Sequence, residues 1–211
     1  GDIMPVSRRL ELVNYSAAHG SLVIEDDFEN EFVYLQKPTP SLFGLAGGQN
    51  VVYLGTFSRL LLPSIRISFM VLPPELSALY RKKADQYNQT ASKAEQIALC
   101  QFIRDGHLAA QTRKLKRLYS VKLKALRSAV QEVFGKDAQI QTGAAGTSLA
   151  LTLSTTLTWQ ELQKKAQTNG LRLQLLREAP GKITLILSCS SMPVADFVPA
   201  CKLLKDISQI Q

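Results

Sequence analysis

The sequence is poor in metal-binding residues and has no long apolar runs. Its 211 residues include only two histidines and three cysteines, which are His19, His107, Cys100, Cys189 and Cys201. They lack the spacing of a zinc site, and an odd number of cysteines is expected to be reduced. No apolar run approaches the roughly 20 residues of a membrane span, and no signal peptide is expected. These absences predict a cytoplasmic protein with no metal and no membrane partner.

Acidic residues are too few to balance the basic ones. The net charge is +8, a value that invites comparison with nucleic-acid-binding proteins. Much of the excess falls in one segment, at Arg113, Lys114, Lys116, Arg117, Lys122, Lys124 and Arg127. Apolar residues interleave with these at helical spacing, so a solvated basic face of an amphipathic helix is the favoured interpretation. No helix-turn-helix, zinc-finger or basic-zipper signature favours DNA recognition by this segment alone.

The remaining composition is that of an ordinary globular protein. With 45% apolar and 20% charged residues, the chain can form one or two compact units. The caps, turns and apolar periodicity predict an alternation of helices and strands. Helices are expected over residues 6–18, 75–87, 92–105, 107–134, 159–168 and 194–207. Strands are expected over residues 22–24, 51–54, 65–72, 138–142, 149–153, 171–175 and 183–188, and residues 38–50 are expected to form a loop.

The most informative stretch is the pair of apolar runs at residues 51–54 and 65–72. Both runs are short, rich in β-branched residues and bounded by glycine or proline, which predicts buried strands. The turn between them carries polar groups, namely Thr56, Ser58, Arg59 and Arg66. Hydroxyl groups together with guanidinium groups suit an anion such as a phosphate.

Carboxylates follow the short strand at residues 22–24, which is expected to be buried. Open parallel sheets place ligand sites outside the carboxyl ends of their strands. These carboxylates are therefore candidate ligand groups, although carboxylates that merely cap the loop are an alternative interpretation.

Three segments resemble the aminotransferase-like domain of MocR-type transcription regulators, a branch of the GntR family. They read MPVSRRLEL at residues 4–12, EDDFENEF at 25–32 and GTFSRLLLPSIRISFMVLPPEL at 55–76. The resemblance implies an α/β chain of fold type I, the fold of pyridoxal-phosphate-dependent aminotransferases. It covers only the second half of that domain. Residues 1–115 would form the latter part of the three-layer αβα large domain, and residues 116–211 the small α+β domain.

The same resemblance implies roles for individual residues. Asp26 matches the aspartate that pairs with the pyridine nitrogen of the cofactor. Phe28 stands where the family has a tyrosine that hydrogen-bonds the ring hydroxyl. Thr56, Ser58 and Arg66 match the ligands of the cofactor phosphate, and Arg59 occupies the position of the lysine that forms the Schiff base.

Arginine cannot take over the chemistry of that lysine. A Schiff base needs a neutral primary amine, whereas a guanidinium stays protonated and has no free amine to condense. The segment at residues 187–192 also lacks the arginine with which the family clamps a substrate carboxylate. With the tyrosine replaced by Phe28, three functional positions differ, which indicates a degenerate site. No covalent cofactor is expected, and pyridoxal phosphate could bind only non-covalently.

Three interpretations of Arg59 remain open at this point. Arg59 pairs with Asp26 in the vacated cofactor space, because a buried cation without a partner is costly. Alternatively, Arg59 and Arg66 hold pyridoxal phosphate non-covalently, or another phosphorylated or anionic effector. In the third interpretation Arg59 merely faces solvent.

The function that follows is an effector-sensing and dimerising module of a MocR-like regulator without covalent cofactor chemistry. The expected partners are a second copy of the chain, a small anionic or phosphorylated effector, and DNA through a winged-helix domain outside this sequence. The alternatives are a pyridoxal-phosphate-dependent aminotransferase, which Arg59 disfavours, and a structural dimerisation domain without a ligand. The run DDFENEF at residues 26–32 favours the regulator over a free-standing aminotransferase, by analogy with the family.

Overall fold

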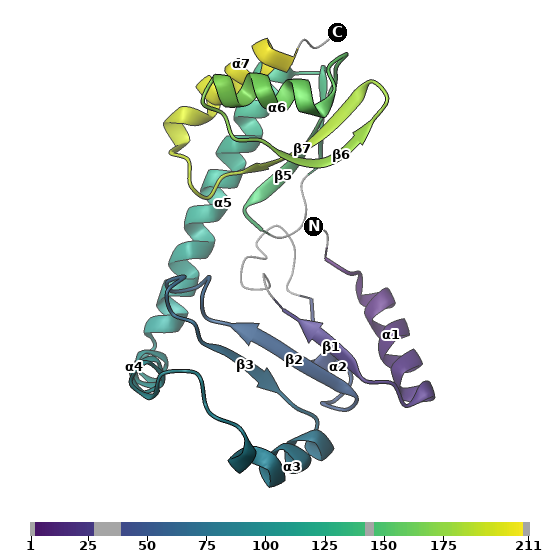
Figure 1. The fold of residues 1–211 in the computed structure, drawn as a ribbon, viewed down its shortest axis with the longest axis vertical. Helices are drawn as coiled ribbons and strands as arrows, with labels where there is room; N and C mark the ends of the chain where they lie inside the picture. Colours follow the sequence, from purple (N-terminus) through teal and green to yellow (C-terminus); the bar gives the residue numbers. More distant parts are fainter. Residues whose placement is uncertain (1–2, 28–38, 142–145, 209–211) are drawn as a thin grey trace. The chain divides into compact units, whose positions relative to one another are not determined.

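The computed structural model describes residues 3–27, 39–141 and 146–208. The chain divides into two compact units, Ile3–Leu115 and Lys116–Gln211, called here the N-terminal and C-terminal units. The boundary falls within the long helix α5 (His107–Phe134). Figure 1 shows a three-stranded sheet in the first unit and a four-stranded sheet in the second.

The N-terminal unit is built on a mixed sheet in the order β1-β2-β3. Its strands are β1 (Val23–Asp26), β2 (Val51–Thr56) and β3 (Ser68–Val71). Its other helices are α1 (Val6–His19), α2 (Leu42–Leu45), α3 (Pro74–Lys83) and α4 (Lys93–Arg104). β1 runs parallel to β2, whereas β3 is antiparallel to it. The parallel pair places the carboxyl ends of β1 and β2 at one edge of the sheet.

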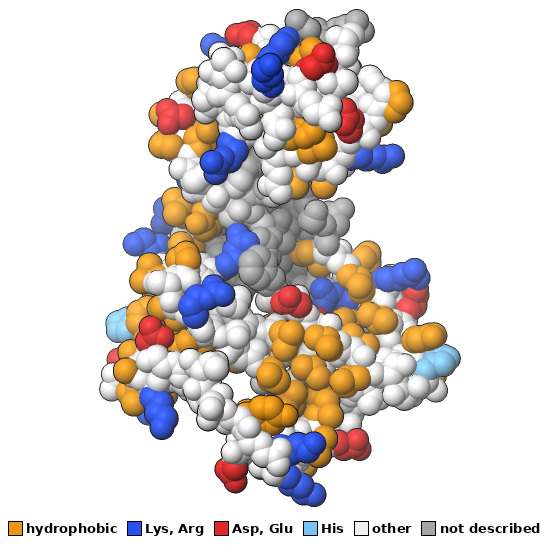
Figure 2. Space-filling model, viewed as in Figure 1, with side chains coloured by type: hydrophobic (Ala, Val, Ile, Leu, Met, Phe, Trp, Pro, Cys, Tyr) orange, Lys and Arg blue, Asp and Glu red, His pale blue; other side chains and the backbone are white. Residues whose placement is uncertain are grey.

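Much apolar surface of this unit is exposed. Val51 and Val52 in the central strand are buried, but Ile24 is 65% exposed and Met70 is 57% exposed. Figure 2 shows apolar side chains gathered on the visible face of this unit. All four residues of β3 are exposed, so the expectation of buried strands at residues 22–24 and 65–72 is wrong for Ile24 and for β3. In the described part of the chain, each of these two strands has a neighbour on one side only.

The C-terminal unit is an antiparallel sheet packed with helices. Its strands, in the order β4-β5-β7-β6, are β4 (Ala138–Gln141), β5 (Ser148–Ser154), β7 (Lys182–Ser188) and β6 (Gln174–Ala179). Its further helices are α6 (Trp159–Thr168) and α7 (Phe197–Ser208). Alternate residues of β5 and β7 are buried, including Leu151 and Leu185. The period of two gives this sheet one apolar face, against which the apolar sides of the helices can pack.

Several predicted boundaries change for local reasons. The predicted strand at residues 171–175 begins at Gln174 instead, because the Leu171 amide donates to the Ala166 carbonyl at 2.8 Å and so closes α6. The loop expected at residues 38–50 contains the short helix α2, where Ser41 accepts from the Gly44 amide. The helix expected over residues 75–87 ends at Lys83 and continues as a 3-10 turn. By contrast, α5 and α6 have the predicted bounds.

Candidate functional site

The polar turn predicted from the sequence lies at the carboxyl end of β2. Thr56 is the last residue of the strand, and Ser58 and Arg59 follow it. The connection is closed by backbone hydrogen bonds, including Phe57 N to the Ile67 carbonyl at 3.1 Å and Leu61 N to the Phe57 carbonyl at 3.0 Å. Asp26 ends the neighbouring parallel strand and is level with Leu54. The structure therefore brings Asp26 and Thr56 to the same edge of the sheet.

The two hydroxyl groups of the turn stabilise its backbone. Ser58 Oγ donates to the Ile65 carbonyl at 2.8 Å. Thr56 Oγ1 accepts from Ser58 N at 3.3 Å and lies 3.5 Å from the Ile67 carbonyl, the weak limit of a hydrogen bond. A hydroxyl has a single proton to donate. Both protons are directed at carbonyls here, so these side chains would have to rotate before they could donate to a phosphate.

The charged residues of the turn differ in exposure. Arg59 is partly buried, while Arg66 and Asp26 are exposed. No hydrogen bond or ion pair within residues 3–27, 39–141 and 146–208 joins Arg59 to Asp26. Of the three interpretations of Arg59, the pair with Asp26 is thus not seen among the described residues. Phe28 lies outside the described residues.

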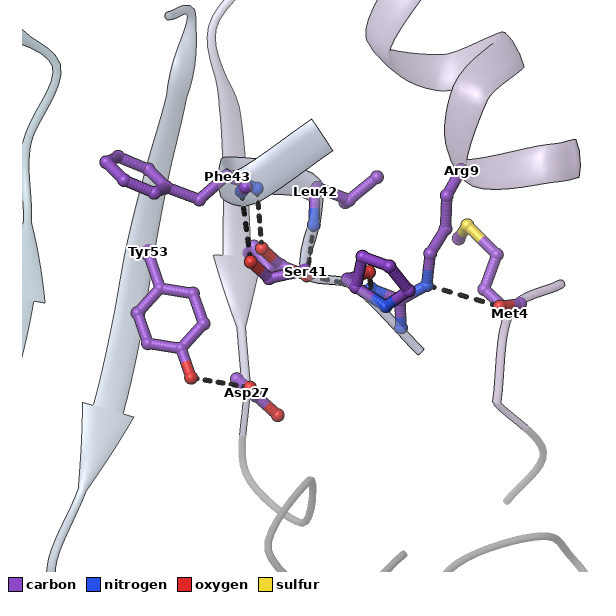
Figure 3. A network of polar contacts seen from close by, with 10 residues as sticks. Met4, Arg9, Asp27, Ser41, Leu42, Phe43 and Tyr53 are labelled. Atoms are coloured by element: carbon purple, nitrogen blue, oxygen red, sulfur yellow. Dashed lines mark hydrogen bonds and ion pairs between the residues drawn. The ribbon is translucent and has the colours of Figure 1, made fainter. Parts of the chain in front are cut away.

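The buried carboxylate at this edge is Glu25, which precedes Asp26. Glu25 is only 9% exposed. Arg9 Nη1 donates to its Oε1 at 3.0 Å, and the amides of Leu42 and Phe43 donate to Oε1 and Oε2 at 2.8 and 3.0 Å. Figure 3 shows this network, in which Arg9 also donates to the Met4 carbonyl at 3.2 Å. Glu25 thus ties α1 and the start of α2 to β1.

Sequence reasoning did not find the role of Glu25. Several carboxylates follow the strand at residues 22–24, and the family resemblance indicated Asp26 among them. Successive residues of a strand face opposite sides of a sheet, so the adjacent carboxylates of Glu25 and Asp26 cannot share one environment. The sequence therefore indicated that only one of the two carboxylates would be buried. It did not indicate which face of the sheet other residues cover.

Aromatic rings lie alongside β2. The Tyr53 hydroxyl donates to Asp27 Oδ2 at 2.5 Å, and its ring lies 6.5 Å from that of Phe43 and 6.2 Å from that of Phe69. Gly55 leaves room for Phe69, because a Cβ atom at Gly55 would clash with the ring of Phe69. The glycine of the predicted motif therefore serves the packing of an aromatic ring.

The connection between β2 and β3 also forms one wall of a cavity of about 400 Å³. Leu61, Leu62 and Ile65 line it from the turn, and Leu99 and Phe102 line it from α4. Within the described residues there is no cluster of three or more potential metal ligands. None of the described helices has the length and apolar character needed to span a bilayer.

Comparison with known proteins shows sequence similarity to transcription regulators. No family model matches the sequence. The uncharacterized HTH-type transcriptional regulator YdeL of Bacillus subtilis is 36% identical over 173 residues, which are 82% of this chain and 37% of YdeL. The probable rhizopine catabolism regulatory protein MocR of Rhizobium meliloti is 30% identical over 83% of this chain and 36% of MocR. The chain is thus similar in sequence to MocR and to an HTH-type regulator.

The fold is that of the fold-type I aminotransferases. The crystal structure of LysN, an α-aminoadipate aminotransferase from Thermus thermophilus, superposes with a TM-score of 0.79 at 24% identity. The superposition covers 98% of this chain and 55% of LysN. The chain thus spans little more than a third of the MocR-type relatives and about half of the enzyme. This confirms the predicted α/β class and the predicted resemblance.

The MocR-type resemblance permits a test of whether this chain's residues suit pyridoxal phosphate. LysN was solved in complex with N-(5'-phosphopyridoxyl)-L-leucine. In this chain, no lysine lies between Val51 and Pro74, so the turn offers no amine for covalent attachment. Arg59 and Arg66 supply positive charge suited to a phosphate. The turn therefore does not suit a covalently attached cofactor, although it could attract an anion.

Proposed function

We propose that the chain is the effector-sensing and dimerising part of a MocR-like transcription regulator that has lost covalent pyridoxal-phosphate chemistry. The relatives with the higher identities quoted above are regulators, which supports this function over an enzymatic one. In this proposal residues 1–115 are the latter part of the large domain and residues 116–211 are the small domain. The site consists of Asp26, Phe28, Thr56, Ser58, Arg59 and Arg66.

The observation that carries the proposal is the guanidinium of Arg59 in the turn after β2. A guanidinium cannot condense with an aldehyde, whereas the positive charges of Arg59 and Arg66 suit a phosphate or a carboxylate. The effector is accordingly proposed to be a small anionic or phosphorylated molecule that binds non-covalently. Pyridoxal phosphate itself is one candidate of this class.

The covalent part of the proposal is tested by borohydride reduction of the complete regulator in the presence of pyridoxal phosphate. Mass spectrometry should find no reduced adduct in this domain of the wild type. The variant Arg59→Lys with Phe28→Tyr should form one at position 59, and Arg59→Gln with Phe28→Tyr is the matched control without an amine. An adduct on the wild-type domain would end the proposal.

Effector binding is tested by thermal denaturation of the same protein with pyridoxal phosphate, pyridoxal and inorganic phosphate. A ligand at about a hundred times its Kd stabilises the folded state by about 2.7 kcal/mol. We expect a shift for the phosphorylated ligand that Arg66→Gln removes. Arg81→Gln in α3, which removes an exposed charge elsewhere in the N-terminal unit, should preserve the shift.

The second candidate function is that of an aminotransferase, which the fold favours. It requires a reducible adduct and transfer of an amino group from an amino acid to a 2-oxo acid. A third outcome, in which no ligand shifts the melting temperature and no adduct forms, would identify a structural dimerisation domain.

The proposed regulator acts in the cytoplasm as a homodimer and contacts DNA through a winged-helix domain outside these 211 residues. The support comes from the names of YdeL, an HTH-type regulator, and MocR, a regulatory protein. Light scattering of the complete protein measures the oligomeric state, and a monomer at micromolar concentration would contradict the dimer.

A further inference from the structure

The positive charge of the chain is concentrated in the C-terminal unit. Residues 116–211 contain thirteen Lys and Arg but six Asp and Glu, whereas residues 1–115 contain twelve and eleven. Nearly all of the net charge of +8 therefore belongs to the C-terminal unit. Such an asymmetry between parts of a chain is a feature of proteins that contact a polyanion.

Part of this charge forms a stripe on α5. Arg117, Lys124 and Arg127 are exposed, and their spacing of seven and three residues puts them on one side of the helix. Leu126 and Val130 on the same helix are buried. No acidic residue occurs in α5 before Glu132. The basic stripe therefore runs along the solvent side of α5 without a neutralising neighbour on the helix itself.

Other elements do not neutralise the stripe either. Among the described residues, none of the ion pairs or side-chain hydrogen bonds involves Arg117, Lys124 or Arg127. Nearby lysines behave differently, since Lys122 donates to the Ser190 carbonyl at 3.0 Å and Lys205 pairs with Asp137 at 3.0 Å. Those lysines stabilise the unit, whereas the stripe has no such internal role.

We infer that this stripe binds the phosphate backbone of duplex DNA. Its three cations extend over ~15 Å of helix and do not converge on a pocket, which suits an extended polyanion better than a small anion. Phosphate contacts of this kind add affinity without reading sequence. The relatives quoted above are regulators, so DNA is the polyanion that such a domain would meet. This contact would be additional to the winged helix and independent of the effector site.

The test measures binding of the 211-residue chain to a 20-base-pair duplex of arbitrary sequence by fluorescence anisotropy between 50 and 200 mM salt. The variant Arg117→Gln/Lys124→Gln/Arg127→Gln should weaken binding about tenfold or more at low salt. It should also lower the slope of log affinity against log salt by about 2 to 3, since each phosphate contact contributes about 0.9. Circular dichroism checks that the exposed substitutions leave the fold intact.

A matched control removes the same charge from the other unit. Arg81→Gln/Lys82→Gln/Lys83→Gln changes three exposed residues of α3 and should weaken binding less than about threefold. Equal losses in the two variants would show that net charge alone attracts DNA, and would overturn the inference. Failure of the wild type to bind DNA, or its preference for vesicles rich in phosphatidylserine over duplex DNA, would overturn it as well.

Discussion

Glu25 connects three segments of the N-terminal unit through a single carboxylate. Two backbone amides at the start of α2 and the guanidinium of Arg9 all donate to it. A carboxylate that is largely withdrawn from water needs such donors, because burial of an unpaired charge is costly. The adjacent Asp26 remains exposed and has no such constraint. At this edge of the sheet, the residue that stabilises the fold and the candidate ligand residue are therefore neighbours in the chain.

Replacement of Glu25 should destabilise the protein far more than replacement of an exposed glutamate. Glu25→Ala leaves Arg9 and two amides of α2 without their acceptor, and should lower the free energy of unfolding by about 2–4 kcal/mol. The control Glu11→Ala breaks the exposed pair of Arg8 and Glu11, at 2.6 Å, and should cost less than about 0.5 kcal/mol. Urea denaturation measures both, and similar losses would contradict the assigned role.

At the scale of elements, α6 is specified locally at its start. Thr158 and Glu161 form a capping box, in which Thr158 N donates to Glu161 Oε2 at 2.8 Å and Glu161 N donates to Thr158 Oγ1 at 3.4 Å. The capping hydrogen bond at the start of α4 is longer and therefore weaker, since Ser92 Oγ accepts from Glu95 N at 3.5 Å. Both caps are visible in the sequence as a hydroxyl residue followed three residues later by a glutamate.

The cap of α6 should give the stability of the C-terminal unit an acid dependence. Hydrogen bonds from the Thr158 backbone and then its side chain lower the pKa of Glu161. The pKa of Glu161 is therefore lower in the folded state than in the unfolded state. The stability that the ionised carboxylate contributes is present above the ordinary glutamate pKa, and it is lost as the pH falls through the folded-state pKa. NMR titration of Thr158→Ala should show the Glu161 pKa returning towards its ordinary value.

The same substitution tests the strength of the cap at neutral pH. Thr158→Ala should lower the free energy of unfolding by about 0.5–2 kcal/mol. Ser92→Ala in α4 is the control and should cost less, because its hydrogen bond is longer. A Glu161 pKa that is unchanged in Thr158→Ala would show that the cap does not form in solution.

At the scale of the whole molecule, the cysteines distinguish the two units. Cys100 is exposed on α4, whereas Cys189 and Cys201 are buried in the C-terminal unit. Burial raises the pKa of Cys201 to about 11 and also raises the pKa of Cys189, although Lys122 partly offsets the latter shift. The thiolate is the reactive form, so the buried pair is protected by both low access and low ionisation.

A thiol reagent at pH 8 should therefore react rapidly with Cys100 and slowly with Cys189 and Cys201. Cys100→Ser should abolish the fast phase, and the slow phase should follow the unfolding of the C-terminal unit as urea is raised. Since the thiol pKa values are raised on folding, stability should fall as the pH rises above about 8.5, the ordinary thiol value. Three equally fast thiols in the folded protein would contradict the assigned burial.

The turn between β2 and β3 shows how far sequence reasoning reached in the candidate site. The sequence predicted its place after a strand, whereas the parallel pairing that brings Asp26 to the same end of the sheet comes from the structure. The pair between Arg59 and Asp26, one of three interpretations, is not formed among the described residues, and the roles proposed for the six site residues remain predictions. The orientation of a side chain depends on what packs around it, and a strand pattern does not contain that information.

The sequence by itself determined the bounds of α5 and α6, most of the order of helices and strands, and the resemblance to MocR-type regulators. Helical periodicity, caps and motifs are encoded by neighbouring residues, which is why these features could be predicted. The tertiary structure alone decided that Glu25 rather than Asp26 is buried, and that β3 is exposed. Within the described part of the chain, it also leaves Arg117, Lys124 and Arg127 without an ion pair. Burial and pairing depend on residues far apart in the chain, and only the folded arrangement brings those residues together.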